Sequence, residues 1–200
     1  MYALHARYRG RERRRAQFVT QSAKALSTLE GVGEFQVLGV EDISAEIHTA
    51  AAVTDTTMAL LSAGDWAVSI AAVAGEGSPL PELGAASDAP SAAQLLAQRE
   101  LGAHARAGSV KVAIQGYGQG EQQLASNISG TFTMLAYILA KRTAEGREAT
   151  SLMRAGLNQN EAAEELGISK QAMSQRLQAA GWQAELAGYQ IALSLLSQAR

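Results

Sequence analysis

The side chains best suited to recognise another molecule lie between positions 170 and 178 of this 200-residue chain. Lys170, Gln171, Ser174 and Gln175 recur at intervals that place them on one side of a helix. Gln hydrogen-bonds to adenine edges, Lys to guanine and Ser to either, so these four residues are candidate base contacts in a DNA major groove. The candidate contacts to DNA phosphates are Arg147, Arg154, Ser169, Arg176 and Gln178.

Two short helices are predicted to position these side chains. Asn158 followed by Glu161 has the spacing of a capping box, which predicts a helix over residues 159–166. Ser169 is placed to cap a second helix over residues 170–180. In such a pair the N-terminal end of the second helix normally contacts bases, and the candidate residues begin at that end.

The connection between the two helices has the composition of a tight turn. Gly167 can adopt the positive φ that the turn requires, and the small Ala163 lets the helices cross closely. The apolar residues predicted to face inward are Leu157, Leu166, Ile168, Met173 and Leu177. A helical hairpin whose polar side chains are merely solvated is the alternative. The agreement of caps, small residue, turn and apolar positions favours DNA binding.

The segment REATSLMRAGLNQNEAAEELGISKQAMSQRLQAAGW, residues 147–182, resembles the helix-turn-helix of sigma-factor region 4 and of LuxR-type regulators. The likeness is to the four-helix form, because a further helix rather than a β-hairpin follows Trp182. It implies binding to duplex DNA. Ala162 departs from the pattern, since these families place a larger aliphatic residue there, and we therefore expect the rest of the chain to support this unit.

The layout of the whole chain is similar to that of the SatD family, through GEFQVLGVED at 33–42 and AVSIAAVAGEG at 67–77. The resemblance implies a cyclase-like α/β domain before the helix-turn-helix. A cyclase-like palm needs paired carboxylates to hold two metal ions. The first predicted strand runs into HARYRG, which offers no acid to pair with Glu34, Glu41 or Asp42. We therefore expect no catalytic residue in this domain.

Other catalytic and metal-binding patterns are missing from the sequence. The chain has no cysteine, and His5, His48 and His104 are too scattered to suggest a ligand set. The glycine-rich GYGQGE at 116–121 could hold an anion on its backbone N–H groups, but it lacks the Lys-Ser/Thr of a P-loop and is predicted to be a strand-to-helix turn. The sequence therefore predicts a protein that is not an enzyme and holds no metal or cofactor.

Charge is distributed unevenly along the chain. Residues 1–24 hold seven basic residues and one acid, residues 30–100 hold eleven acids and one base, and residues 141–200 hold seven bases and six acids. The basic start provides a candidate auxiliary patch for DNA phosphates, made of Arg11, Arg13, Arg14 and Arg15. The alternative is a solvated junction neutralised by the acidic middle of the chain, and both interpretations stay open.

The periodicity of apolar residues and the positions of glycine and proline predict an α/β (α+β) N-terminal domain with a small mixed sheet, followed by an all-α helix-turn-helix domain. Strands are expected over 2–8, 34–40, 66–75 and 109–118, and helices over 12–29, 44–63 with Ser44 as cap, 91–107 and 120–142. An exposed loop is expected over 75–91. The predicted domains are 1–120, a buried connecting helix over 121–145, and 146–200.

These features predict a cytoplasmic, bacterial-type transcriptional regulator, because no signal peptide and no run of apolar residues long enough to span a bilayer is visible. Its expected partners are double-stranded DNA, a second copy of the chain, and a small-molecule or protein effector at the N-terminal domain. Dimerisation is assigned to the apolar stripe of 183–199 or to the 124–140 helix. The alternative function is a protein-interaction adaptor that keeps the helix-turn-helix fold.

Overall fold

The computed structural model describes residues 1–74 and 89–199 and contains a mixed sheet with β1 at its centre. Within these residues the strands are β1 (Tyr2–Tyr8), β2 (Gln36–Val37), β3 (Asp42–Ile47), β4 (Trp66–Val73) and β5 (Val110–Gln115). Their order across the sheet is β2-β3-β1-β4-β5. β1 runs antiparallel to both β3 and β4, while β5 pairs parallel with β4. The prediction of an α/β or α+β chain with a mixed sheet is confirmed.

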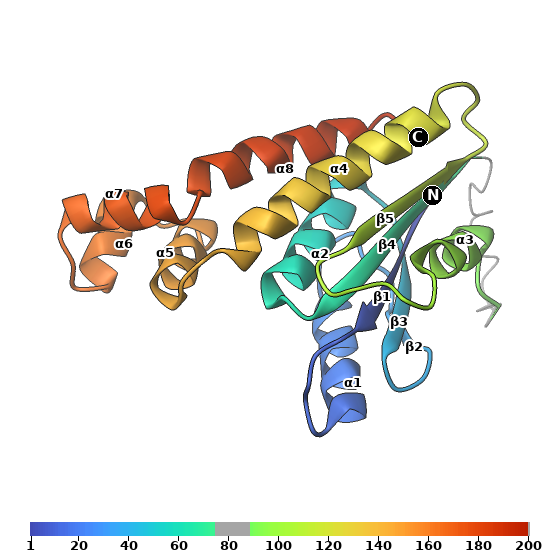
Figure 1. Cartoon of the computed structure of the whole chain (residues 1–200), viewed down its shortest axis with the longest axis horizontal. Helices are drawn as coiled ribbons and strands as arrows, with labels where there is room; N and C mark the ends of the chain where they lie inside the picture. Colours follow the sequence, from blue (N-terminus) through green and yellow to red (C-terminus); the bar gives the residue numbers. More distant parts are fainter. Residues whose placement is uncertain (75–88, 200) are drawn as a thin grey trace.

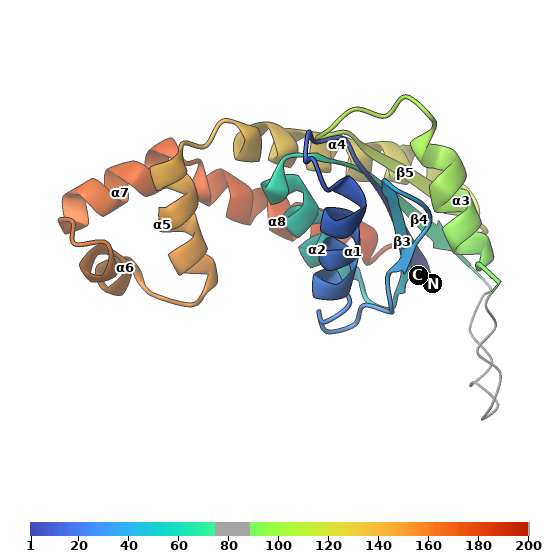
Figure 2. The same ribbon diagram turned by 90° about the horizontal axis from the view of Figure 1, so that it is seen from below.

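Eight helices accompany this sheet in the described part of the chain. They are α1 (Arg15–Leu26), α2 (Ala50–Ala63), α3 (Ala92–Leu101), α4 (Glu121–Ala140), α5 (Ala144–Arg154), α6 (Gln159–Glu165), α7 (Lys170–Ala179) and α8 (Trp182–Leu196). α3 covers one face of the sheet, and α1, α2 and α4 cover the other (Figures 1 and 2). α5, α6 and α7 project beyond the sheet at one end of the molecule (Figure 1).

The central strand serves both faces of the sheet because its side chains alternate. Leu4 and Ala6 face the main core, which contains α2 and α4, whereas Ala3 packs against α3. His5 also lies on the α3 face and is fully buried. The two faces therefore differ in size, with a large apolar core on one side and a thin alanine-rich contact on the other.

α8 ties the two ends of the molecule together. It packs along α4, and its last turns place Ala192 and Leu196 in the main core. Gly188 permits the close approach, since a Cβ at that position would lie 2.7 Å from Leu135 Cδ2. The helix that follows the candidate DNA-reading segment is thus anchored on the α/β part of the chain.

The helix predicted over residues 44–63 is shorter than expected, and Ser44 is not its cap. Residues 42–47 form β3, and α2 begins at Ala50 behind the Thr49 hydroxyl, which accepts from the Ala52 N–H at 3.0 Å. The alternation of residues 43–47 also fits a strand, and pairing with β1 along its length decides between the two.

Three other expectations need correction. The strand predicted over 34–40 is limited to the two exposed residues of β2, because it is an edge ribbon that turns at Gly39. The 91–107 helix ends at Leu101. The 120–142 helix is not buried all round, since Met134 and Tyr137 are 60% and 66% exposed. Of the loop predicted over 75–91, residues 75–88 lie outside the described part of the chain.

Among the described residues, no helix combines the length and the apolar character needed to cross a bilayer.

Candidate nucleic-acid interface

Helices α5, α6 and α7 form a three-helix unit (residues 144–179) with an apolar core of its own. The buried members of this core are Ala149, Ala162, Ala163, Met173, Leu177 and Trp182, and Leu152, Met153, Leu157, Leu166 and Ile168 pack against them. All five apolar positions expected from the sequence belong to it. Trp182 is the first residue of α8, so the unit's core is closed by the helix that leads back to the sheet.

The turn between α6 and α7 has the local geometry that its residues predict. Asn158 and Glu161 form a complete capping box at the start of α6. Gly167 has φ +62°, which a side chain would strain. The Ser169 hydroxyl accepts from the Ala172 N–H at 3.1 Å and so caps α7. The orientation of α7 is therefore fixed by backbone capping and by burial of Met173.

The candidate base contacts lie on the outer side of α7. Lys170, Gln171, Ser174 and Gln175 are all exposed. At 100° per residue they occupy about 140° of the helix circumference, opposite the buried Met173. No hydrogen bond or ion pair within the described residues engages their side chains. α7 lies at the end of the molecule farthest from the sheet, so neighbouring chain does not cover this side (Figures 1 and 2).

Four of the five candidate phosphate contacts are exposed or partly exposed on the three-helix unit and its cap. Arg147 is exposed, although its Nη1 donates to the Arg142 carbonyl at 2.9 Å. Arg176 is partly buried, and its Nη1 lies 4.0 Å from the Glu148 carboxylate. Gln178 is exposed beside a groove between α7 and the start of α8 that Ser174 also lines. Ser169 is exposed and acts as the cap of α7.

An acidic side chain, Glu145, lies at the start of α5 near the basic side chains of Arg147 and Arg176. The pKa of Glu145 is lowered, mainly by a hydrogen bond from its own backbone N–H and further by the Thr143 side chain. Arg176 and Arg147 add a smaller favourable Coulomb contribution. This part of the surface therefore carries both signs of charge at neutral pH.

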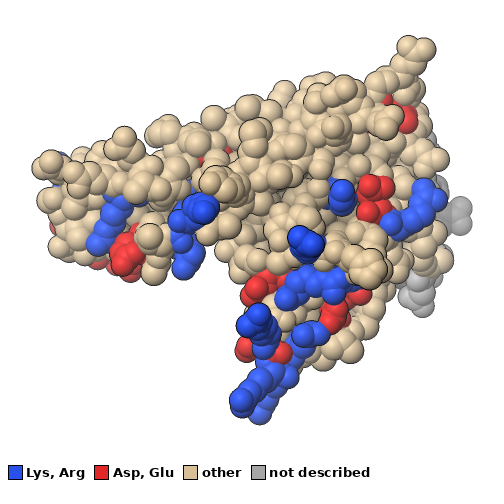
Figure 3. All heavy atoms as spheres, in the orientation of Figure 1, with Lys and Arg blue, Asp and Glu red and all other residues tan. Residues whose placement is uncertain are grey.

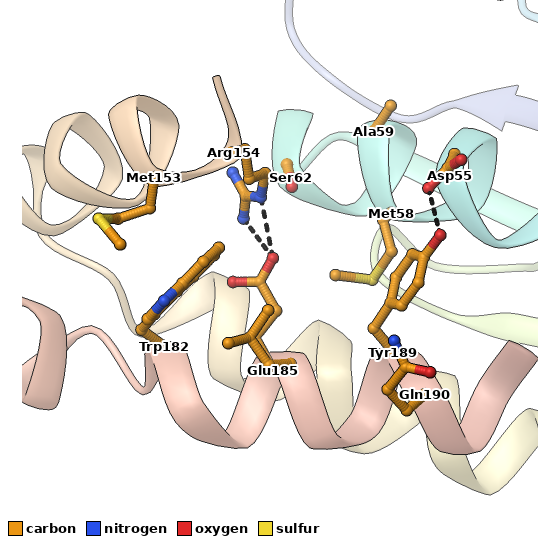
Figure 4. A pocket seen from close by; sticks show the side chains of 11 residues that line it. Asp55, Met58, Ala59, Ser62, Met153, Arg154, Trp182, Glu185, Tyr189 and Gln190 are labelled. Carbon is orange, nitrogen blue, oxygen red and sulfur yellow. Dashed lines mark hydrogen bonds and ion pairs between the residues drawn. The ribbon is translucent and has the colours of Figure 1, made fainter. Parts of the chain in front are cut away.

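Arg154, the remaining phosphate candidate, is 38% exposed and pairs with an acid of the protein itself. Its Nε donates to Glu185 Oε1 at 2.9 Å, and the other carboxylate oxygen of Glu185 accepts from Arg142 Nη2. Arg142 also donates from Nε to the Ala180 carbonyl at 2.8 Å. Figure 4 shows Arg154 reaching across from α5 to α8. The Arg142–Glu185–Arg154 network therefore fastens α5 and the end of α7 to α8.

Sequence reasoning missed Arg142 and Glu185. One signal was available: Glu185 is the only charged residue of the otherwise apolar or neutral stretch 182–196. An acid in such a helix needs a buried basic partner, because an unpaired buried charge is costly. Nothing in the local sequence indicates that the partners are 43 and 31 residues away.

The arginines at the start of the chain divide into two groups. Arg7 and Arg9 donate to carbonyls of the 102–105 segment, and they pair with Asp42 and Glu41. Arg15 pairs with Glu41. Arg11, Arg13 and Arg14 are exposed, with no acidic partner within 4.0 Å among the described residues. Figure 3 shows basic side chains gathered over α1, separated by a hollow from those at the α5–α7 end.

The glycine-rich turn at 116–121 and the buried His5 both have partners within the protein. In the glycine-rich turn at 116–121 the Glu121 carboxylate accepts from the Gly118 N–H at 2.8 Å and from the Tyr117 N–H. This turn therefore carries its own carboxylate where an anion would bind. His5 Nε2 lies 3.1 Å from Asp42, and burial lowers the pKa of His5. Within the described residues no group of three or more His, Cys, Asp and Glu could hold a metal ion.

The comparisons with known proteins returned no match: no family model fits the chain, and neither a curated protein nor a solved structure resembles it significantly.

Proposed function

We propose that the chain is a DNA-binding transcriptional regulator whose α6–α7 pair is a helix-turn-helix. The observation that carries the proposal is the unpartnered polar face of α7, held outward by a fully capped turn and a buried Met173. Its amide, ammonium and hydroxyl groups match base edges of the major groove.

In this mechanism α7 enters the major groove with Lys170 and Gln171 leading. Gln171 and Gln175 each offer a donor and an acceptor for an adenine edge, Lys170 donates to guanine, and Ser174 contacts either base. Arg147 and Arg176 flank the groove and hold phosphates. Arg154 already pairs with Glu185, and we propose that it positions α5 instead of holding a phosphate.

A second copy of the chain is the partner that the outer surface of α4 fits. Met134 and Tyr137 are exposed there, and α4 carries no charged residue after Glu121. Figure 3 shows the ridge formed by α8 and α4 with almost no charged side chain. Apart from Lys141, whose ammonium lies 5.4 Å from the Tyr137 ring centroid, this surface carries few charges and can pair with itself across a two-fold axis with little like-charge repulsion. Two copies of α7 would then read two half-sites.

The DNA-binding proposal is tested by selecting duplexes from a random pool and measuring affinity for the enriched site. The variant with Lys170→Ala, Gln171→Ala and Gln175→Ala should bind that site at least about 100-fold more weakly, since each good base contact contributes roughly 1–3 kcal/mol of discrimination. The matched control changes Gln36→Ala and Gln98→Ala, two exposed glutamines on β2 and α3. It should bind as the parent does.

Two outcomes would contradict the proposal. Unchanged affinity of the triple variant would remove α7 as the reading element. Failure of the parent protein to enrich any duplex, or to be retained on DNA at low salt, would reject DNA binding and favour the interaction adaptor.

Dimerisation is tested separately by light scattering of the full chain. Tyr137→Asp should convert a dimer to a monomer, because it places a charge in the centre of an apolar contact. Leu95→Asp, which alters a 51% exposed residue of α3, is the matched control and should leave the mass unchanged. A parent protein that is monomeric at all concentrations would contradict this part of the proposal.

A further inference from the structure

A cleft of about 620 Å³ lies where the three-helix unit meets the α/β part of the chain. α2 lines one side and α5 the other, with α8 along the floor (Figure 4). Its volume lies in the range of small-molecule sites, and most of its lining is apolar, including Met58, Trp182 and Tyr189. Ligand sites of this kind commonly lie between domains.

The charges of the cleft are not balanced along its length. At one end Arg142 and Arg154 both pair with Glu185, which leaves that end with one net positive charge. At the other end the exposed Asp55 accepts a hydrogen bond from the Tyr189 hydroxyl at 2.8 Å. No Lys, Arg or His of the described residues lies within 4.0 Å of Asp55. This end therefore holds a carboxylate without a counterion beside an aromatic ring.

The ionisation of Tyr189 is consistent with this negative environment. Burial raises the pKa of Tyr189 to about 12, and its hydrogen bond and Coulomb interaction with Asp55 act in the same direction. The phenol therefore stays protonated at physiological pH and keeps Asp55 in place as an acceptor.

The other end of the cleft already contains the contact that a cation makes with an aromatic ring. The Arg154 guanidinium lies over the Trp182 ring at 5.9 Å from its centroid. Attraction between a cation and the negative face of an aromatic ring strengthens as water is excluded. The Trp182 ring is therefore already covered by a cation, and the cleft offers the Tyr189 ring and the Asp55 carboxylate beside an apolar space.

We propose that this cleft binds a small organic ammonium ion with an aromatic or apolar body. The ammonium group pairs with Asp55, and the body packs on Met58, Tyr189 and the apolar floor of α8. A carboxylate placed beside Asp55 would be repelled, and a neutral group in the same position would gain no charge pair.

Ligand binding in the cleft changes the position of α7 through shared side chains; this step rests on the proposed function. Trp182 lines the cleft and belongs to the core of the three-helix unit. Arg154 and Glu185, which fasten α5 to α8, also line it. A ligand that shifts these side chains changes the angle between the unit and the sheet, and therefore the spacing of two α7 helices in a dimer.

Binding is tested by calorimetry on the full chain without DNA, using phenethylamine, 3-phenylpropionate and 2-phenylethanol as probes of one shape and three charges. The amine should bind at least about tenfold more tightly than the other two, because only the amine gains the charge pair with Asp55. Equal binding of the three probes, or no binding of the amine, would overturn the proposal.

Variants locate the site. Asp55→Asn should abolish the preference for the amine, while Asp65→Asn, which removes an exposed acid beyond the end of α2, should not. Ala59→Trp should fill the cleft and block the amine, whereas Ala51→Trp, two turns earlier on the same helix, should not. If the two members of either pair behaved alike, the assigned location would be wrong.

The regulatory step has its own readout. Phenethylamine should change the affinity of the parent protein for its selected duplex, and Asp55→Asn should remove that change. Amine binding without any change in DNA affinity would overturn the coupling alone. A protein that binds the amine but no DNA would overturn the proposed function and leave the binding site standing.

Discussion

The joint around Glu185 and the outer face of α7 belong to consecutive helices, yet they use polar side chains in opposite ways. At the joint, the Arg142 and Glu185 side chains are 2% and 5% exposed and paired with each other. On α7, Lys170, Gln171 and Gln175 are exposed and have no partner in the described chain. The polar groups of the joint are buried and therefore need partners inside the protein, whereas water can satisfy the exposed groups of α7 until a second molecule binds. This contrast separates Arg154 from the other arginines of the three-helix unit.

The largest effect is expected at the joint. Glu185→Gln leaves the Arg142 guanidinium buried without its counterion, so the free energy of unfolding should fall by about 3–5 kcal/mol in urea denaturation. Glu148→Gln is the matched control, because Glu148 is 60% exposed and its ion pair is weak: Glu148 Oε2 lies 4.0 Å from Arg176 Nη1. Its effect should stay within about 0.5 kcal/mol.

A double variant keeps this test informative if Glu185→Gln fails to fold. Arg142→Met combined with Glu185→Leu removes both buried charges, and well-packed apolar residues often replace such pairs without loss. The double variant should therefore recover most of the stability. A small effect of Glu185→Gln, similar to that of Glu148→Gln, would show that the joint does not depend on this network.

The two arginines of α5 sharpen the comparison. Arg154→Ala should lower the free energy of unfolding by about 2 kcal/mol, because it removes charged hydrogen bonds to the buried Glu185. Arg147→Ala should change stability by no more than about 0.5 kcal/mol. In DNA binding, Arg147→Ala should reduce the slope of log K against log salt by about 1, and Arg154→Ala should leave it unchanged. The reverse result would return Arg154 to the DNA surface.

Ser169, which caps α7, and Ser174 within α7 show the same difference between a side chain that holds the fold and an exposed one, with a smaller expected effect. Ser169 caps the helix through the Ala172 N–H, and Ser174 lies one turn later with no described partner. Ser169→Ala should therefore cost about 1 kcal/mol of stability. Ser174→Ala should change it by no more than about 0.5 kcal/mol, since it alters an exposed site. Thermal unfolding of the two variants measures the difference, and equal melting temperatures would contradict the assigned cap.

The smallest effect concerns His5, a buried polar group of the sheet. Burial lowers the pKa of His5 below its usual 6.5 in the folded state, so the unfolded chain binds the proton more readily. Stability should therefore decrease as pH falls below about 6.5, by less than roughly 1.4 kcal/mol per pH unit.

Two histidine variants isolate this contribution. His5→Gln should flatten the decrease in unfolding free energy between about pH 6.5 and 5.5, the range in which the unfolded imidazole titrates. His104→Gln alters an exposed histidine and should leave the pH profile unchanged. Identical profiles for the two variants would contradict the burial of His5.

Sequence reasoning was accurate where the deciding interactions are local. The capping box of α6, the positive φ of Gly167, the Ser169 cap and the inward positions of Met173 and Leu177 all lie within a few residues of their partners. Prediction from the sequence failed where the pairing partner of a segment is distant along the chain. Residues 42–47 became a strand because β1 was available to pair with them. The 34–40 strand shrank to two residues because only one neighbour was available at the sheet edge.

The sequence by itself determined the local order of helices, caps and turns and the polar face of α7, because helix capping and amphipathic periodicity operate over one or two turns. Tertiary structure decided which charged groups remain free to bind a partner. Arg147 and Arg154 look equivalent along α5, and only the packing of α8 brings Glu185 against one of them. The physical reason is that burial and charge pairing depend on distance in space, which the chain sets only after it has folded.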